Sequence, residues 1–262
     1  MAHANDIINR MEGLRNEAQA LHLMRFFKTG PGQYGEGDRF LGIKVPVTRS
    51  LVKEMRDFPL DEVPTLLASE WHEVRLCGLL LMVAAHARLS TRRLMDDAEA
   101  TKARDRIVQL YLTHAHRANN WDLVDLSAPG ITGSWLLQPT FLGGGLYTPE
   151  PHNEHKLAVL DDLAASDCLW LQRIAMVSTL TPTRHGDPSY CLRYAEALLH
   201  HRHDLMHKAV GWMLREMGKH VGMDTLRSFL DRHAATMPRT ALRYAIEHMD
   251  ADERRHYMNL RP

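Results

Sequence analysis

The sequence contains few cysteines, no long hydrophobic run and no stretch with the strict apolar–polar alternation of a half-buried strand. Its three cysteines, Cys77, Cys168 and Cys191, are isolated, which excludes a disulfide framework and is typical of a reducing compartment. The longest apolar run, residues 79–85, falls far short of the roughly 18 residues that a membrane span needs. The polar N-terminus also lacks the apolar segment of a signal peptide. We therefore expect a cytoplasmic protein with no membrane segment.

An excess of charge of either sign is absent too. The 262 residues include 32 Lys+Arg and 32 Asp+Glu, so the formal net charge is zero. Indiscriminate binding to nucleic acid depends on the neutralisation of phosphates, and a neutral chain is poorly suited to it. A neutral chain can nevertheless collect its cations on one face. If this protein binds nucleic acid, its basic surface has to be a local stripe.

Patterns that indicate metal, phosphate or nucleotide binding are missing as well. His203 and His207 lie four residues apart, but neither a glutamate nor a cysteine pair completes a zinc site, which favours a solvated turn between helices. Glycines 143–145 are not followed by the Lys-Ser or Lys-Thr of a phosphate-binding loop, and no strand pattern precedes them. We predict that the protein uses no metal ion and no cofactor.

Helical periodicity runs through almost the whole chain. Apolar residues recur at steps of three and four over residues 7–24, and Pro46 stands where a second helix begins, since its missing N–H costs nothing there. A segment rich in glycine and proline, residues 28–38, separates the two. Further helices are expected at about 61–68, 71–87, 91–114, 121–137, 154–165, 168–180, 187–200, 204–220, 222–233 and 238–247.

Many helices of this length with short connections predict an all-α fold built from helical hairpins. The hairpins follow one another at roughly 35–45 residues, which is typical of HEAT-type solenoids, although periodicity alone leaves a plain helical bundle open. Residues 138–154 are irregular, but the helical pattern resumes unchanged after them. We therefore interpret them as an exposed loop and expect one HEAT-like repeat domain over residues 1–262.

Trp121 and Asp125 form the most informative pair in the sequence. They lie four residues apart near the start of a predicted helix, so their side chains share a face. The helix dipole favours an ionised carboxylate in the early turns. Such a carboxylate beside an aromatic wall can stabilise a developing cation or orient an attacking water. The alternative is a core tryptophan followed by a solvated aspartate.

A second pattern places cations around a tryptophan. Lys208, Trp212 and Arg215 form one stripe at helical spacing, and Gly211 beside the tryptophan permits the close approach of a backbone or a ligand. The alternative is an amphipathic helix whose cations extend past a buried tryptophan to solvent. Three arginines in later helices are further candidate phosphate contacts: Arg173, Arg239 and Arg243.

With these residues the chain resembles the DNA alkylation repair glycosylases of the AlkD family. The resemblance covers roughly residues 18–247. It implies an α-solenoid of HEAT-like repeats whose concave basic face holds duplex DNA. It also implies excision of cationic N3- and N7-alkylpurines without a metal or cofactor, and without enclosure of the base in a pocket. The segments that carry it are Met24–Lys28, Phe40–Pro46, Trp121–Asp125, Ser166–Arg173 and Lys208–Glu216.

Carried over to this sequence, the resemblance implies a role for each of these residues. Asp125 matches the catalytic carboxylate, Trp121 and Trp212 match an aromatic pair near the lesion, and Arg173 and Arg215 match cations on the DNA backbone. The remaining candidate DNA contacts are Lys208, Lys28, Arg239, Arg243, Phe26 and Tyr34.

The N-terminal part departs from the family in two ways. Phe26 stands where the family has a tyrosine, although Tyr34 lies in the loop just beyond it. That loop, Gly30–Arg39, is also longer than in the family members it resembles. We expect a monomer that acts on double-stranded DNA containing alkylated purines. The rival hypothesis is a non-catalytic HEAT-like scaffold that binds DNA structures or a protein, and retention of Asp125 with both tryptophans favours the enzyme.

Overall fold

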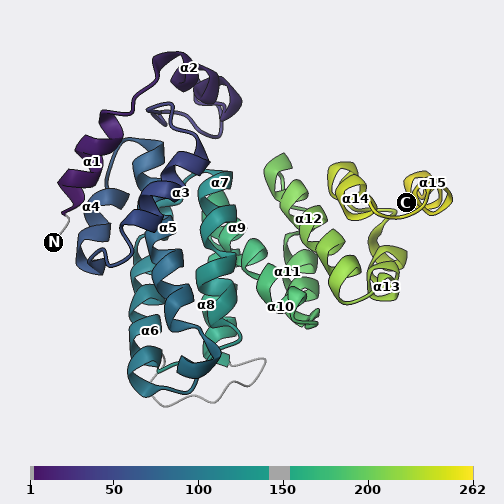
Figure 1. The fold of residues 1–262 in the computed structure, drawn as a ribbon. Helices are drawn as coiled ribbons and strands as arrows, with labels where there is room; N and C mark the ends of the chain where they lie inside the picture. Colours follow the sequence, from purple (N-terminus) through teal and green to yellow (C-terminus); the bar gives the residue numbers. More distant parts are fainter. Residues whose placement is uncertain (1–2, 142–153, 262) are drawn as a thin grey trace. The chain divides into compact units, whose positions relative to one another are not determined.

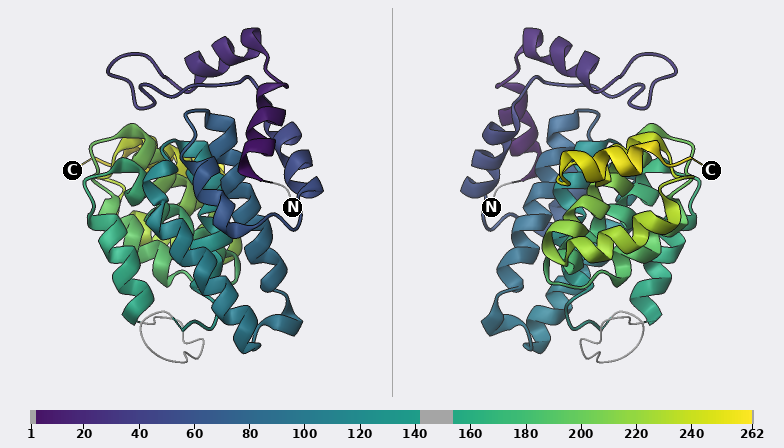
Figure 2. Two further views of the ribbon diagram at one scale, coloured as in Figure 1. Left: turned by 90° about the vertical axis from the view of Figure 1, so that its left-hand side faces the viewer. Right: turned by 90° about the vertical axis from the view of Figure 1, so that its right-hand side faces the viewer.

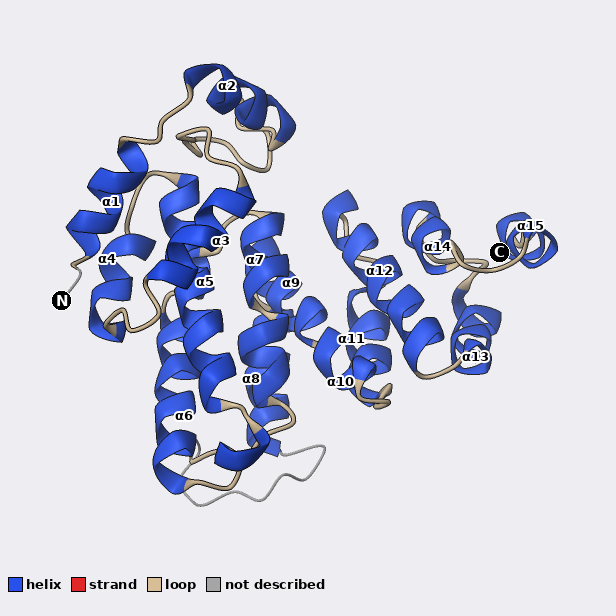
Figure 3. Ribbon diagram, viewed as in Figure 1, coloured by secondary structure: helices blue, strands red, loops and turns tan. Residues whose placement is uncertain are grey.

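The computed structural model describes residues 3–141 and 154–261, and these residues are helical or lie in turns and loops (Figure 3). No strand occurs among them, and the only sheet-like pairing is an isolated parallel bridge between Arg39 and Trp71. The predicted all-α fold class is therefore confirmed. No helix in this part of the chain is long and apolar enough to cross a membrane.

The chain forms two compact units. The first comprises Met1–Ile131 and Pro139–Thr148, and the second comprises Thr132–Gln138 and Pro149–Pro262. Most of the loop predicted over residues 138–154 lies outside the described residues. That the two units act as one repeat domain stays a prediction.

The first unit is built around one buried helix, α5. This helix packs against α3, α4, α6 and α7, and it is covered on most of its surface, so its sequence carries an apolar run and not a single stripe (Figure 1). The α-helices are α1 (Ala4–Glu12), α2 (Glu17–Phe26), α3 (Val45–Glu54), α4 (Val63–Leu67), α5 (His72–Leu89), α6 (Ala98–Thr113) and α7 (Trp121–Ser127). Short 3₁₀ turns span Leu60–Glu62, Arg92–Leu94 and Ala115–Arg117.

The second unit is built around α12, which packs against α9, α10, α11, α13 and α14. Gly211 of α12 permits the contact with α14, because a Cβ at this position would lie 2.5 Å from the Cβ of Tyr244. The glycine beside Trp212 thus admits a neighbouring helix. The α-helices are α8 (Glu154–Ala165), α9 (Leu169–Ser178), α10 (Leu180–Arg184), α11 (Ser189–Leu198), α12 (Asp204–His220), α13 (Met223–His233), α14 (Arg239–Ala245) and α15 (Ala251–Asn259).

Three differences from the predicted helices have local causes. The periodic segment 7–24 is two helices, because the chain turns after Gly13 and the Asn16 side chain caps α2 by accepting a 2.9 Å hydrogen bond from the Gln19 N–H. The helix expected over 121–137 gives way after α7 to a π turn that begins at Pro129, which has no N–H to continue the α ladder.

The third difference is α15, which the periodicity did not predict. Only Tyr257 of its residues is buried, so it presents no apolar stripe. It begins instead at a strong cap, since the Asp250 carboxylate accepts hydrogen bonds from the N–H groups of Asp252 and Glu253, each at 2.9 Å.

Helix α2 lies at one end of the first unit and packs side by side with no other described helix (Figures 1 and 2). It is held by the loop that leads into α3. The buried Glu73 carboxylate of α5 accepts hydrogen bonds from three consecutive N–H groups of this loop, those of Leu41, Gly42 and Ile43, at 2.9, 2.8 and 3.0 Å. The Asn16 N–H at the start of α2 then donates to the Leu41 carbonyl at 2.8 Å.

We expect Gly42→Ala to destabilise the protein far more than Gly186→Ala. Both glycines have a positive φ, +86° and +88°, so alanine is strained at either position, at a cost of about 1–2 kcal/mol. A Cβ at Gly42 would also clash with the Asn16 carbonyl and lie 2.7 Å from the Ala20 nitrogen. A Cβ added at Gly186 would meet no heavy atom within 4 Å apart from its chain neighbours. Urea unfolding should show an additional loss of about 2 kcal/mol or more for Gly42→Ala. Equal losses would contradict the close approach at Gly42.

Candidate functional site

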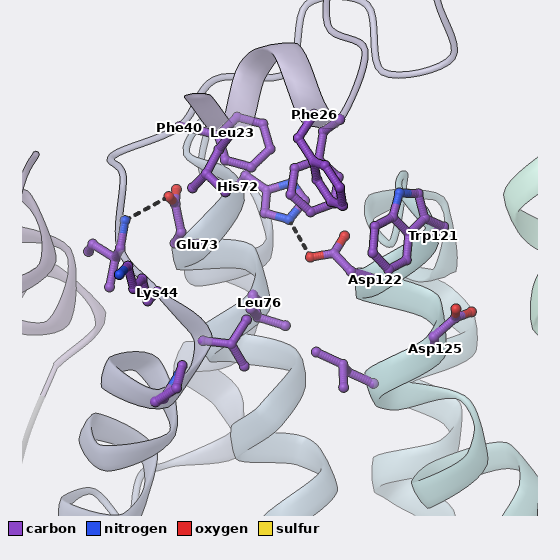
Figure 4. A pocket seen from close by; sticks show the side chains of 15 residues that line it. Leu23, Phe26, Phe40, Lys44, His72, Glu73, Leu76, Trp121, Asp122 and Asp125 are labelled. Atoms are coloured by element: carbon purple, nitrogen blue, oxygen red, sulfur yellow. Dashed lines mark hydrogen bonds and ion pairs between the residues drawn. The ribbon is translucent and has the colours of Figure 1, made fainter. Parts of the chain in front are cut away.

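The first unit contains a pocket of about 460 Å³ between α2, α3, α5 and α7 (Figure 4). Pockets that bind small molecules have volumes of roughly 300–1,000 Å³ and are mostly apolar, with a few polar groups that orient the ligand. This pocket has that composition, because its carboxylates stand among aromatic and aliphatic side chains. The apolar lining includes Leu23, Phe26, Phe40, Leu76, Trp121 and Leu126.

Trp121 belongs to an aromatic cluster at this pocket. Its ring stacks on Phe27 with centroids 5.2 Å apart, and it meets the edge of Phe26 at 5.9 Å. Phe27 in turn stacks on Phe40 at 5.1 Å. Phe26 is 56% exposed, so it stands at the mouth of the pocket, while Trp121 is half-buried. The structure therefore brings together two of the aromatic residues that the sequence singled out.

Asp125 lines the same pocket, one turn after Trp121 on α7 (Figure 4). The helix begins at Trp121, whose N–H donates to the Asn120 side chain at 2.9 Å. This start is the predicted one, and Asp125 lies in the early turns of the helix as expected. The residue in the first turn, where the helix dipole acts most strongly, is Asp122, and Asp125 lies one turn further along.

A buried chain of charged groups lies behind the pocket, and the sequence analysis missed it. His72 is the first residue of α5, and its imidazole sits between two carboxylates. Nε2–H donates to Asp122 Oδ2 at 2.9 Å, and Nδ1–H donates to Asp38 Oδ2 at 2.7 Å. Arg75 also donates to Asp38 Oδ1, at 2.5 Å. The imidazole stacks on Phe40 with centroids 4.3 Å apart.

These contacts decide the charge of His72. Burial by itself lowers the pKa of a histidine, but the negative charge of Asp122 and the hydrogen bonds to Asp122 and Asp38 outweigh it and raise the pKa of His72 to about 9. Burial likewise acts to raise the pKa of Asp38, and the hydrogen bonds and positive charges of His72 and Arg75 outweigh it and lower that pKa. His72 is therefore an imidazolium at neutral pH.

No spacing rule could have found this chain of charges, because its members are 34 and 50 residues apart in the sequence. One signal was present. His72, Glu73 and Arg75 are polar residues at the start of an otherwise apolar helix, and all three are buried. Polar groups in such a position need partners, which have to come from other segments.

The two remaining N-terminal candidates, Tyr34 and Lys28, are not among the residues that line the pocket. The Tyr34 hydroxyl donates to the Phe26 carbonyl at 3.5 Å, so the loop folds back against the end of α2. Lys28 is exposed and has a φ of +54°, the only non-glycine residue with a positive φ among those described.

In the second unit most of the predicted cations already have partners. Lys208 pairs with Asp204 at 2.9 Å, and Arg215 pairs with Glu247 and lies 3.9 Å from Glu216. Trp212 is half-buried on the same helix. The resemblance implies that Trp212 and Trp121 form an aromatic pair near the lesion with Arg215 on the DNA backbone, and this stays a prediction.

The other arginines of this unit differ in exposure. Arg173 is only 4% exposed and donates to the Leu205 carbonyl at 2.5 Å, and its contact with the DNA backbone stays a prediction. Arg239 donates to the Met258 carbonyl and so links α14 to α15. Arg243 is exposed on α14.

A basic groove in the first unit was also missed. It has a volume of about 300 Å³ and is lined by Arg49 and Lys53 of α3, by Arg56 in the turn that follows α3, and by Arg88 of α5, together with Val52 and Ala84 and without a carboxylate. None of these four cations forms an ion pair within residues 3–141 and 154–261. The spacing of Arg49, Lys53 and Arg56, at steps of four and three, is visible in the sequence.

Residues 3–141 and 154–261 hold no cluster of three or more His, Cys, Asp or Glu side chains arranged to bind a metal ion. The histidines near α12 have structural partners. The N–H of Leu205 donates to the His203 ring, and His201 Nε2 lies 2.8 Å from Gln172 Oε1.

The raised pKa of His72 predicts a pH-dependent contribution to stability. The stabilisation of the folded state by protonated His72 is complete below pH 6.5, the ordinary pKa of histidine. It is lost as the pH rises through about 9, the pKa of His72 in the folded protein. We expect His72→Gln to be less stable than the wild type at pH 6 by about 3 kcal/mol, with a smaller difference at pH 10. Urea unfolding at the two pH values measures this, with His22→Gln at an exposed position of α2 as the matched control. A difference that does not change with pH would contradict the imidazolium.

Comparison with known proteins agrees with this fold. The family model described as DNA alkylation repair enzyme matches residues 7–249. The solved structure of a predicted DNA alkylation repair enzyme from Enterococcus faecalis has a TM-score of 0.61 and 15% sequence identity, over 90% of this chain and 97% of that chain. At this identity the likeness shows the fold alone. None of the curated proteins matches the sequence. Because the family model spans nearly the whole sequence, the chain belongs to the DNA alkylation repair enzyme family.

Proposed function

We propose that the protein is a DNA glycosylase that excises positively charged N3- and N7-alkylpurines from duplex DNA. Membership of the family supports a role in the repair of alkylated DNA, with DNA as the partner. The observation that carries the finer proposal is the pairing of Asp125 with Trp121 at one pocket. A carboxylate beside aromatic faces is suited to a reaction in which positive charge is present from the start.

Excision of such a base does not require a strong general acid. An N3- or N7-alkylated purine already bears a positive charge, so it leaves readily when the N-glycosidic bond breaks. The sugar then develops oxocarbenium character, which the Asp125 carboxylate stabilises electrostatically, and the same carboxylate can orient the attacking water. The ring of Trp121 offers its negative face to the cationic base or sugar.

The basic groove supplies a path for the DNA backbone in the same unit. Val45 lines the pocket, and Arg49 and Val52 of the same helix, α3, line the groove. These three residues follow one another at steps of four and three, so they share one face of the helix. With a rise of about 1.5 Å per residue, Val52 lies about 10 Å along α3 from Val45. A strand bound in the groove would therefore pass close to the pocket.

We expect Asp125→Asn to lower the rate of excision by about a hundredfold or more while DNA affinity changes little, because the carboxylate acts on the transition state. The measurement is the release of 3-methyladenine and 7-methylguanine from methylated duplex DNA. Asp96→Asn, at an exposed position before α6, is the matched control. Excision by Asp125→Asn at the wild-type rate would overturn the mechanism. No release by the wild type above background, with DNA binding intact, would favour the non-catalytic scaffold.

We expect the double variant Arg49→Glu and Lys53→Glu to weaken binding to duplex DNA and to make it less sensitive to salt. Each lost phosphate contact should reduce the slope of log affinity against log salt concentration by about one. Fluorescence anisotropy with labelled duplex at several salt concentrations measures both effects. Lys102→Glu is the control, because Lys102 is exposed on α6 and already pairs with Glu99 at 2.8 Å. An unchanged slope in the double variant would exclude the groove as a DNA contact.

A further inference from the structure

The charged chain behind the pocket is linked to the residues on both sides of Trp121. The His72 imidazole donates to the carboxylate of Asp122, which follows Trp121 in the first turn of α7. Asp38, the second carboxylate at His72, also accepts a 3.3 Å hydrogen bond from the side chain of Asn120. Asn120 precedes Trp121 and accepts the hydrogen bond from its N–H at 2.9 Å. Both chain neighbours of Trp121 are therefore linked to His72, one directly and one through Asp38.

The ring of Trp121 is supported from the same centre. It stacks on Phe27 with centroids 5.2 Å apart and an interplanar angle of 25°. The Phe27 and His72 rings lie 5.1 Å apart, and both stack on Phe40, at 5.1 and 4.3 Å. The faces of such rings attract a cation like the imidazolium. His72 therefore supports the side chain of Trp121 as well as the backbone around it.

The Asp122 carboxylate depends on His72 for its compensation. The residue is 7% exposed, and Figure 4 shows its carboxylate between His72 and Trp121. Oδ2 accepts the 2.9 Å hydrogen bond from His72, and Oδ1 is buried without a hydrogen-bond partner among the described residues. A buried carboxylate that loses its one charged partner is costly. Without the imidazolium, the first turn of α7 would have to shift until water reaches Asp122, and Trp121 would move with it.

The same shift would reach Asp125. This residue follows Asp122 by three positions on α7, a helix of only seven residues. Positions three apart are neighbours on a helix surface, so the first turn also sets the place of Asp125. A displacement of about 1 Å in the groups that act on a substrate can slow a reaction about a hundredfold.

We propose that His72 is a positioning residue for excision, which holds Trp121 and Asp125 in the orientation that acts on the DNA. Its side chain is only 2% exposed, so it acts through Asp122 and the aromatic rings and does not touch the substrate. This inference rests on the proposed function for the reaction, whereas the contacts that hold Trp121 are independent of it.

The charge of His72 gives this role a pH signature. The charged groups that face the imidazole are Asp38 from the loop and Asp122 from α7. On α5 itself, Arg75 pairs with Asp38, and Glu73 accepts hydrogen bonds from the loop. Burial lowers the pKa of His72, but the charge of Asp122 and the hydrogen bonds to both carboxylates outweigh it and raise the pKa to about 9. The imidazolium is therefore lost as the pH rises through that value, and excision should slow with it.

Single-turnover excision of 7-methylguanine from duplex DNA, with the protein in excess, separates the rate from the DNA affinity. At neutral pH, His72→Gln should lower the rate at saturating protein by about tenfold or more and change the Kd for DNA by less than about twofold. Val108→Ala is the matched control. Val108 is buried in α6 and does not line the pocket, so this variant is destabilised but should excise at the wild-type rate. A wild-type rate in His72→Gln, or an equal loss in Val108→Ala, would overturn the proposal.

The pH profile separates positioning from a purely structural role and needs no variant that could fail to fold. Far-UV circular dichroism shows at which pH values the wild type is folded. Over that range its rate should fall through about pH 9, and the profile of a folded His72→Gln should be flat there. A wild-type rate that stays constant from about pH 8 to pH 10 would show that the charge of His72 does not align the site.

A spectroscopic measurement distinguishes failure of this role from failure of the proposed function. The difference in near-UV circular dichroism between the wild type and Trp121→Phe reports the Trp121 ring, and it should change through about pH 9. Such a change without any release of base would overturn the glycosylase and support the positioning of Trp121. Excision with a rate and a Trp121 signal that both ignore pH would overturn the positioning alone.

Discussion

The first unit depends on an imidazolium held between two buried carboxylates. His72 joins the loop that carries Asp38 to the start of α7 at Asp122, and these segments are far apart in the sequence. Buried charges of this kind stabilise a fold only as a complete set, because the loss of one partner leaves another charge uncompensated. Asp122 follows Trp121, and Asp38 lies two residues before Phe40. The network therefore fixes the aromatic walls of the pocket along with the backbone.

Sequence patterns predicted the helices well where an apolar stripe or a long apolar run was present, and they failed where a helix begins or ends for another reason. Helix α15 depends on the cap at Asp250 and buries one side chain, so periodicity could not reveal it. At the site, Trp121 and Asp125 could be found because helical spacing places them one turn apart. The role of His72 could not, because its partners are brought to it by tertiary packing alone.

The second unit shows why counting cations is a poor guide to a binding surface. Arg173 and Arg239 are candidate phosphate contacts, and in the structure their guanidinium groups donate to the backbone carbonyls of other helices. Several N–H donors on one planar group make arginine well suited to such a role. The four cations of the basic groove have no carboxylate among the other residues that line it. In a chain with no net charge, the partners of each cation decide where a basic surface remains.

Helix α2 forms one wall of the pocket. A small cluster of Ala20, Phe27 and Phe40, with Trp121 packed against it, and the loop held by Glu73 attach this helix to the rest of its unit. Its free energy of local opening is therefore set by these few contacts and not by the core around α5. Substitutions in the two regions should have nearly additive effects on stability. The wall that α2 forms can thus accept substitutions at little cost to the core around α5.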